Sequence, residues 1–193
     1  PHVGLIESHG RAILGHLAPF STLVELGPGN GEKLVALIEA GRTLSEPLNA
    51  HLIDVSPAAL SAAARTLSAM PDVHVVTHQA PYEAGLAEVT HERPEGGRTI
   101  ALFLGSNIGN FDRPGADAFL LGIRAALARG DGLLVGADLV KPERELVAAY
   151  DDPLGVTAAF NRNLLVRINR ELGGDFDLEA FAQGLIDRAD RLL

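Results

Sequence analysis

Two strand-like segments that each end near an acidic residue constrain the fold of this chain more than any other feature. Residues 23–33 read LVELGPGNGEK, an apolar run that leads through Glu25 into a glycine-rich turn, and residues 51–54 read HLID, which ends on Asp54. In open α/β sheets, ligands bind beyond the carboxyl ends of the strands, where glycines let the backbone approach and a carboxylate accepts from ribose hydroxyls. The pair therefore predicts an α/β protein that binds a nucleoside cofactor.

The rest of the chain repeats the same alternation. Apolar runs typical of strands occur at about residues 22–26, 50–54, 73–77, 99–104 and 132–138. Segments with helical spacing separate them, which is the pattern of a mostly parallel sheet with helices on both faces. Ser56-Pro57 predicts one helix start, and Asp112 predicts the start of a helix over 113–129. Beyond residue 140 three further helices are predicted, over 142–149, 157–171 and 177–192.

Composition narrows the class of protein. The chain has 193 residues, 47% of them hydrophobic, with no cysteine, and its sequence holds no apolar stretch long enough to span a membrane. A net charge of −9 argues against nucleic acid as a partner. No signal peptide is visible, so we expect a cytoplasmic protein with one domain over residues 1–193. Because the chain begins at Pro1 rather than Met, we expect the natural protein to be longer.

The glycine turn alone is compatible with NAD(P), FAD or S-adenosyl-L-methionine. Gly27, Gly29 and Gly31 form the pattern E-x-G-x-G-x-G, and the position where a dinucleotide motif would have its third glycine is Glu32. The charge of Glu32 would oppose a pyrophosphate at this helix start. S-adenosylmethionine carries no phosphate, and its ammonium and carboxylate groups suit a turn with Glu25 before it and Lys33 after it. The spacing favours S-adenosylmethionine.

A second polar segment follows the fourth predicted strand. Residues 104–111 read LGSNIGNF, with Gly105 and Asn110 directly beyond an apolar run. The parallel arrangement puts this segment at the same sheet edge as Gly27 and Asp54, where Asn110 could bind a substrate carboxylate or amine. An alternative is a turn whose asparagines satisfy their own backbone. Proximity to the predicted cofactor edge favours binding.

Five stretches carry a resemblance to a known family. LVELGPGNGEK, HLIDVSP, LFLGSNIGNF, GLLVGADLVKP and above all AYDDPLGVTAAFNRNLLVRINRELGGDFD resemble the histidine-specific S-adenosylmethionine-dependent methyltransferases, over about residues 20–180. The best-known member makes trimethylhistidine for ergothioneine biosynthesis, and other members methylate other amino-acid amines, including a prenylated tryptophan. The resemblance implies a Rossmann-like class I methyltransferase core, S-adenosyl-L-methionine as cofactor, and methyl transfer to the α-amino group of an amino acid, L-histidine first.

The resemblance also assigns roles to residues of this chain. Gly27 matches a backbone contact to the methionine moiety, Lys33 a cation near its carboxylate and Asp54 an acid at the ribose; Gly29 and Gly105 belong to the same predicted cofactor site. The adenine contact falls at Pro81 and Tyr82, where Tyr82 covers the adenine face and Pro81 lacks the side-chain acceptor of some members. Asn110 and Tyr150 match the residues that hold the amino and carboxylate groups of the substrate.

Neither a general base nor a metal is predicted. The reaction implied is an in-line displacement by the substrate amine, for which the protein supplies positioning. Of the seven histidines, His51 lies beside the second predicted strand, and His74 and His78 lie around the third. We expect these three to be hydrogen-bonded or solvated rather than catalytic or metal-bound, because no cluster has metal-ligand spacing.

The substrate half of the family pattern is incomplete in this sequence. Family members continue past the fifth strand with antiparallel strands, whereas this chain ends at Leu193 in a predicted helix. The edge of the strand at 132–138 is therefore expected to be covered by a missing segment, by a partner subunit in an oligomer or by the C-terminal helix. The alternatives to an active methyltransferase are a truncated or degenerate cofactor-binding relative without turnover and an NAD(P)-dependent oxidoreductase.

Overall fold

The computed structural model describes residues 2–41, 48–92, 97–105, 107–150 and 152–180. The chain divides into two compact units, Pro1–Asp138 (unit 1) and Leu139–Leu193 (unit 2). The single domain expected over the whole chain stays a prediction.

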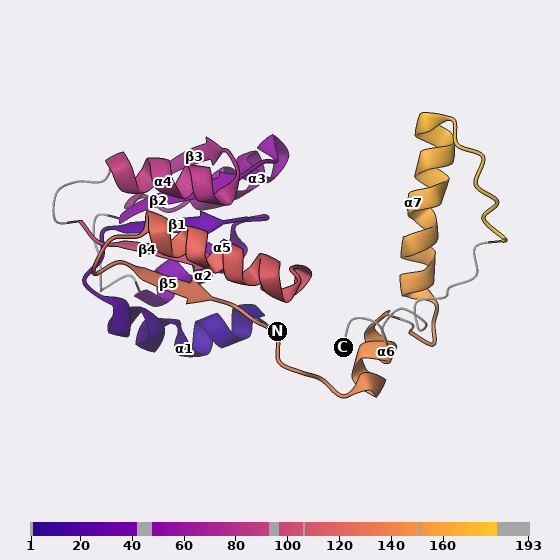
Figure 1. The fold of residues 1–193 in the computed structure, drawn as a ribbon, viewed down its shortest axis with the longest axis horizontal. Helices are drawn as coiled ribbons and strands as arrows, with labels where there is room; N and C mark the ends of the chain where they lie inside the picture. The colour runs from indigo at the N-terminus through magenta and orange to yellow at the C-terminus, as the bar shows by residue number, and fades with distance from the viewer. Residues whose placement is uncertain (1, 42–47, 93–96, 106, 151, 181–193) are drawn as a thin grey trace. The chain divides into compact units, whose positions relative to one another are not determined.

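Unit 1 is built on a five-stranded sheet in which the described strands pair in parallel (Figure 1). The strands are β1 (Thr22–Leu26), β2 (Leu48–Asp54), β3 (Val73–Gln79), β4 (Thr99–Phe103) and β5 (Gly132–Val135). Their order is β3-β2-β1-β4-β5. The chain thus builds outward from β1 through β2 to β3 and then returns to the other side of β1, so that β1 and β4 flank a topological switch point.

The five predicted strands are confirmed, and the differences lie at their ends. β2 begins earlier than expected and β3 continues to Gln79, while β4 stops at Phe103 and β5 at Val135. The predicted fifth strand over 132–138 is too long at its end. Directly after β5, the Gly136 backbone N–H still donates to the Phe103 carbonyl at 2.8 Å.

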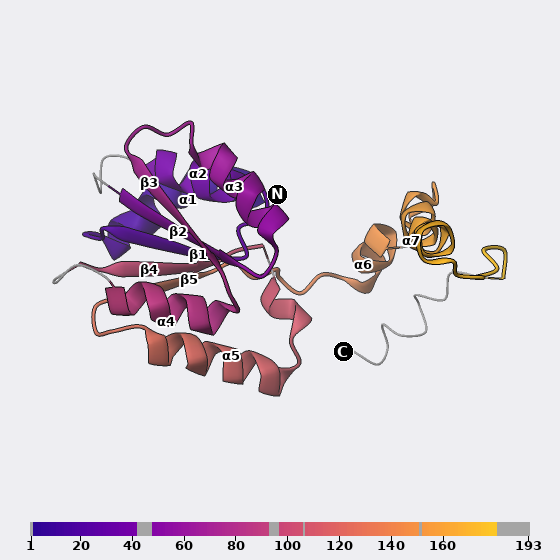
Figure 2. The same cartoon turned by 90° about the horizontal axis from the view of Figure 1, so that it is seen from above.

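Helices cover both faces of the sheet, as predicted. They form two groups, one on each face of the sheet, as Figure 2 shows. The first group is α1 (His2–Leu17), α2 (Glu32–Gly41) and α3 (Pro57–Leu67); the second is α4 (Tyr82–Glu92) and α5 (Arg113–Ala126). Both predicted caps are confirmed, because the Ser56 hydroxyl accepts from the Ala59 N–H at 3.3 Å and the Asp112 carboxylate from the Gly115 N–H at 2.8 Å. The helix expected over 113–129 ends earlier, at Ala126.

The alternation along β1 decides which side chains face which helices. Leu23 belongs to the core that includes residues of α1, α2 and α3, whereas Val24 and Leu26 belong to the core that includes residues of α4 and α5. Because side chains alternate along a strand, Glu25 shares the face of Leu23. The acidic residue of the motif therefore lies on the side of α2, which carries Lys33.

Unit 2 contains the helices predicted after residue 140. α6 spans Glu143–Tyr150 and α7 spans Val156–Leu172, close to the predicted ranges. In the helix predicted over 177–192, residues 178–180 form a turn, and the segment 181–192 lies outside the described residues. Within the described part of the chain, none of the helices combines the length and apolar character that a membrane span requires.

Candidate functional site

The glycine turn lies at the switch point, directly after β1. Gly27, Gly29 and Gly31 all have positive φ angles, of 75°, 57° and 82°. L-residues with a side chain rarely adopt this conformation, so the sequence pattern has a backbone cause. The Gly27 N–H donates to the Ile53 carbonyl at 2.9 Å, which ties the turn to the end of β2.

Two polar side chains lie over Gly27. A Cβ atom built on this glycine would lie 2.8 Å from the Tyr82 hydroxyl and 3.8 Å from the Asn107 amide nitrogen. The Tyr82 ring is held edge-on against Phe103 and Phe119, with centroids 5.7 and 6.1 Å away. Burial, and then the charge of Asp54, raise the pKa of the Tyr82 phenol. Gly27 thus leaves the room in which this hydroxyl approaches the backbone.

Lys33 crosses from α2 to the loop that follows β4. A Cβ atom on Gly105 would lie 2.5 Å from the Lys33 ammonium nitrogen, and Gly105 has a φ angle of 96°. The positive φ angle favours glycine at position 105, whereas the Lys33 ammonium is the end of a flexible side chain that could shift. The ammonium group therefore lies at the carboxyl edge of β4, beside the switch point.

Glu25 is the most deeply buried acid of this region. Its side chain is 2% exposed, and its Oε2 atom has no hydrogen-bond partner within the described part of the chain. Burial raises the pKa of the Glu25 carboxyl to about 8, and the positive charge of Lys33 opposes the rise. The set of predicted cofactor residues omitted Glu25, although an acid between an apolar strand and a glycine turn was the signal for it.

Asp54 ends β2 on the same edge of the sheet. One of its carboxylate oxygens accepts from the Ser56 N–H at 2.8 Å, which fixes the start of the turn into α3. Pro81 is exposed and immediately precedes α4, where its carbonyl accepts from the Gly85 N–H at 3.0 Å. Of the two residues expected at the adenine, Tyr82 has its hydroxyl close to Gly27 in the glycine turn, and Pro81 is exposed at the protein surface.

The two predicted substrate residues differ in what the structure describes. Asn110 is exposed at the end of a 3-10 turn over Asn107–Asn110. The first asparagine of that turn, Asn107, is the one close to Gly27. Tyr150 ends α6 in unit 2, and its side chain lies outside the described part of the structure. The structure thus brings together Gly27, Lys33, Asp54, Tyr82 and Gly105, all within unit 1.

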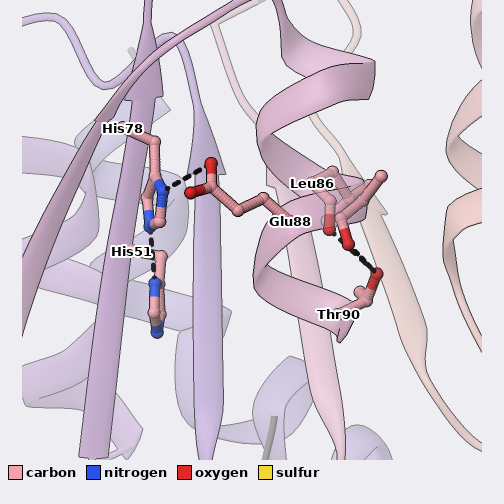
Figure 3. Close-up of polar contacts among 6 residues, drawn as sticks. His51, His78, Leu86, Glu88 and Thr90 are labelled. Carbon is pink, nitrogen blue, oxygen red and sulfur yellow. Dashed lines mark hydrogen bonds and ion pairs between the residues drawn. The ribbon is translucent and has the colours of Figure 1, made fainter. Parts of the chain in front are cut away.

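A histidine cluster lies on β2, β3 and α4. His78 lies between His51 and Glu88 (Figure 3): its Nε2 is 2.9 Å from the His51 Nδ1, and its Nδ1 is 3.3 Å from the Glu88 carboxylate. The expectation that these two histidines are hydrogen-bonded is confirmed, and His74 is exposed as expected of a solvated residue. Over the described residues, no group of three or more metal-ligating side chains gathers in metal-binding geometry.

A parallel sheet whose glycine turn and flanking acids meet at the switch point defines an α/β protein that binds a nucleoside cofactor. A family model for histidine-specific, S-adenosylmethionine-dependent methyltransferases matches residues 3–186, and this chain belongs to that family. The family match decides against the NAD(P)-dependent oxidoreductase alternative.

Individual relatives agree with the family match. The chain is 45% identical over 162 residues to the histidine N-alpha-methyltransferase of Mycobacterium tuberculosis. The matched segment covers 83% of this chain and 49% of that protein. It is 29% identical to ergothioneine biosynthesis protein 1 of Neurospora crassa, over 89% of this chain and 20% of that protein. The chain thus spans about half the length of the first relative and a fifth of the second.

A solved structure supports the fold. A methyltransferase structure from Thermobifida fusca, described as putative, matches 78% of this chain and 58% of its own length, with a TM-score of 0.50 and 18% sequence identity. At this identity the likeness shows the fold alone. It agrees with the predicted Rossmann-like class I methyltransferase core.

Proposed function

We propose that this chain forms the cofactor-binding part of an N-methyltransferase that transfers methyl groups from S-adenosyl-L-methionine to the α-amino group of L-histidine. One observation carries the proposal. This chain is 45% identical to a histidine N-alpha-methyltransferase, and it has its glycine turn, Glu25 and Lys33 together at the switch point of the sheet. We also propose a cytoplasmic location, and the net charge of −9 argues against a nucleic-acid partner.

The residues at the switch point fit the cofactor. Gly27 has no side chain where a ligand would approach the turn, and the buried Glu25 Oε2 has no described partner. An orphaned buried carboxyl is costly unless a donor completes it, and the α-ammonium group of the cofactor is such a donor. Lys33 is the matching cation for the α-carboxylate.

The remaining cofactor contacts follow from the same edge. Asp54 accepts from the ribose hydroxyls, and Tyr82 packs against the nucleoside. The other residues line the cofactor site with their backbone or their surface: Gly29, Pro81 and Gly105. Each belongs to unit 1. S-adenosylmethionine supplies an electrophilic methyl group on a sulfonium, which a neutral amine attacks without a metal.

The protein's part in the reaction is to hold the substrate. Asn110 and Tyr150 bind the amino and carboxylate groups of the amino acid and so orient its amine for in-line attack. No residue is assigned as general base, and the amine loses its proton to water or to a nearby acceptor. A further proposal concerns assembly: β5 is an edge strand of the described sheet, and a second subunit pairing there would complete it.

One alternative keeps the cofactor site and drops turnover. In that case the chain binds S-adenosylmethionine as a degenerate relative without methyl transfer. The reason to weigh it is that only two residues of this sequence, Asn110 and Tyr150, are assigned to the amino acid. The two functions differ in whether an amino acid binds after the cofactor.

Isothermal titration separates the proposed function from its alternative. S-adenosylhomocysteine is titrated into the chain, and L-histidine is then titrated into the complex. We expect S-adenosylhomocysteine to bind, and histidine to bind only afterwards. Asp54→Ala should weaken the first step about tenfold or more, through loss of the ribose contact. Asp117→Ala removes an exposed carboxylate on α5 and is the matched control.

The outcomes are distinct. Binding of S-adenosylhomocysteine without any response to histidine favours the alternative. The absence of S-adenosylhomocysteine binding by a folded chain contradicts both functions. Methyl transfer is then followed by mass spectrometry, with histidine and tryptophan as competing substrates.

A further inference from the structure

Glu25 is an unusual residue to find at the centre of a parallel sheet, because its side chain ends in a carboxyl group. It pairs in register with Leu52 of β2 and Leu102 of β4, so apolar residues flank it on both sides. With 2% of the residue exposed and Oε2 without a described partner, water cannot solvate a charge here. A carboxyl group in such surroundings favours its neutral form.

The charged groups on the surrounding elements do not reverse this preference. Lys33 on α2 is the charge that acts on Glu25, and it lowers the carboxyl pKa only in part, leaving it at about 8. The other charged side chains on the described parts of α2 and α3 are exposed: Glu32, Glu39 and Arg65. β4 has no titratable side chain, and Asp54 on β2 acts on Tyr82.

We propose that Glu25 carries a proton in the cofactor-free protein and releases it when the α-ammonium group of the cofactor binds, so that cofactor binding expels one proton. The inference rests on the proposed function, since it requires a ligand that brings an ammonium group to this carboxyl. The O–H bond of Glu25 breaks, the proton goes to solvent, and the ammonium keeps its three protons and donates to the new carboxylate. Charge is conserved.

Proton release makes the affinity depend on pH in one direction. By linkage, a ligand that displaces one proton binds up to about tenfold more tightly for each unit of rise in pH, as long as the free protein remains protonated. With the pKa of Glu25 at about 8, this range includes pH 6 to 7.5. A preformed carboxylate would give an affinity that is nearly independent of pH there.

Calorimetry in two buffers measures the proton directly. S-adenosylhomocysteine is titrated into the full chain at pH 7 in phosphate and in Tris, which differ in the heat that they release on protonation. S-adenosylhomocysteine is used because its sulfur is uncharged, so any proton signal does not come from a sulfonium. We expect the difference in heat to correspond to nearly one released proton for the wild type and to almost none for Glu25→Gln.

Glu32→Gln is the matched control, because it removes an exposed acid at the start of α2, seven residues along the same motif. It should release the same proton as the wild type. If Glu25→Gln does not fold, the dissociation constant of the wild type at pH 6 and pH 7.5 provides a second test.

The possible results distinguish failure of the proton-release inference from failure of the proposed function. Binding with the same heat in both buffers, or an affinity that does not change between pH 6 and 7.5, overturns the inference and leaves the proposed function intact. A folded wild type that does not bind S-adenosylhomocysteine overturns both. A proton that is still released by a folded Glu25→Gln also overturns the inference, since another group then supplies it.

Discussion

At the scale of single residues, Gly27 joins backbone conformation to the ligand site. Gly27→Ala places a methyl group 2.8 Å from the Tyr82 hydroxyl, on a residue with φ of 75°. The conformation alone costs about 1–2 kcal/mol. The Tyr82 ring, packed by Phe103 and Phe119, cannot easily move away. We expect a loss of about 2–3 kcal/mol in the free energy of unfolding, measured with urea.

Gly29→Ala is the matched control for this effect. Gly29 also has a positive φ angle, but a Cβ atom there would meet no heavy atom within 4 Å. It should lose only the conformational part. Adding Tyr82→Phe to Gly27→Ala should restore part of the stability, and a Gly27→Ala protein no less stable than Gly29→Ala would show that the hydroxyl contact has no energetic role.

Sequence reasoning found the candidate site unevenly, for reasons that lie in individual residues. Gly27, Lys33 and Asp54 follow strands or start a helix, so their meeting at one edge follows from parallel topology. Asn107 lies close to Gly27 and Asn110 is exposed because of the path of a 3-10 turn, and a pattern of apolar residues does not predict that path. The approach of the Tyr82 hydroxyl to Gly27 depends on a ring that packs against Phe103 of β4 and Phe119 of α5, and it could not be predicted from spacing.

At the scale of secondary-structure elements, the start of α5 has a strong local determinant. The Asp112 carboxylate accepts from the Gly115 N–H at 2.8 Å, and Pro114 follows in the first turn. Asp112→Ala should destabilise the protein by about 1 kcal/mol through loss of the cap, whereas Asp112→Asn retains an acceptor and should cost less. Urea unfolding of both variants checks this, and equal losses would contradict a capping role.

The His51–His78–Glu88 cluster connects β2, β3 and α4 and predicts a dependence of stability on pH. Burial, and then the charges of His78 and His74, lower the pKa of His51 to about 4 from its ordinary 6.5. The unfolded chain takes up a proton near pH 6.5 and the folded protein only near pH 4. Stability contributed by neutral His51 is therefore present above pH 6.5 and is lost as the pH falls towards 4.

His51→Asn removes this titration. The full pKa shift would correspond to about 3 kcal/mol, and solvent screening of the half-buried ring reduces the expected acid-dependent loss to about 1 kcal/mol. Between pH 6.5 and 4.5 the wild type should lose this much more stability than His51→Asn, as measured by urea unfolding at each pH. His9→Asn, at an exposed histidine of α1, should follow the wild type. Parallel curves for all three proteins would rule out the effect.

The elements themselves were predicted more completely than their contacts. Apolar runs located the five strands of the described sheet, because buried parallel strands are continuously apolar. No prediction was made for α1, whose glycines resemble helix breakers. In the structure, Gly10 lies where a Cβ would meet Ala40 at 2.9 Å, and Gly41 lies against Leu14. These glycines permit close packing of α1 on α2, a reason that appears only once the helices are paired.

At the scale of the whole molecule, the division into two units separates the two halves of the proposed reaction. The predicted cofactor residues all belong to Pro1–Asp138: Gly27, Gly29, Lys33, Asp54, Pro81, Tyr82 and Gly105. Of the predicted substrate residues, Asn110 belongs to the same unit and Tyr150 to the other. Cofactor binding and amino-acid binding should therefore respond differently to removal of unit 2.

A chain that ends at Asp138 tests this directly. Both apolar layers of the sheet are made from residues of unit 1, so the shortened chain should fold. We expect it to bind S-adenosylhomocysteine within about twofold of the affinity of the full chain, a difference below 0.5 kcal/mol. Its response to histidine should be lost together with Tyr150. Tyr150→Phe in the full chain is the milder comparison, and it should weaken histidine binding while leaving S-adenosylhomocysteine unaffected. A shortened chain that unfolds cooperatively in urea but binds S-adenosylhomocysteine more than about tenfold less tightly would show that unit 2 takes part in holding the cofactor.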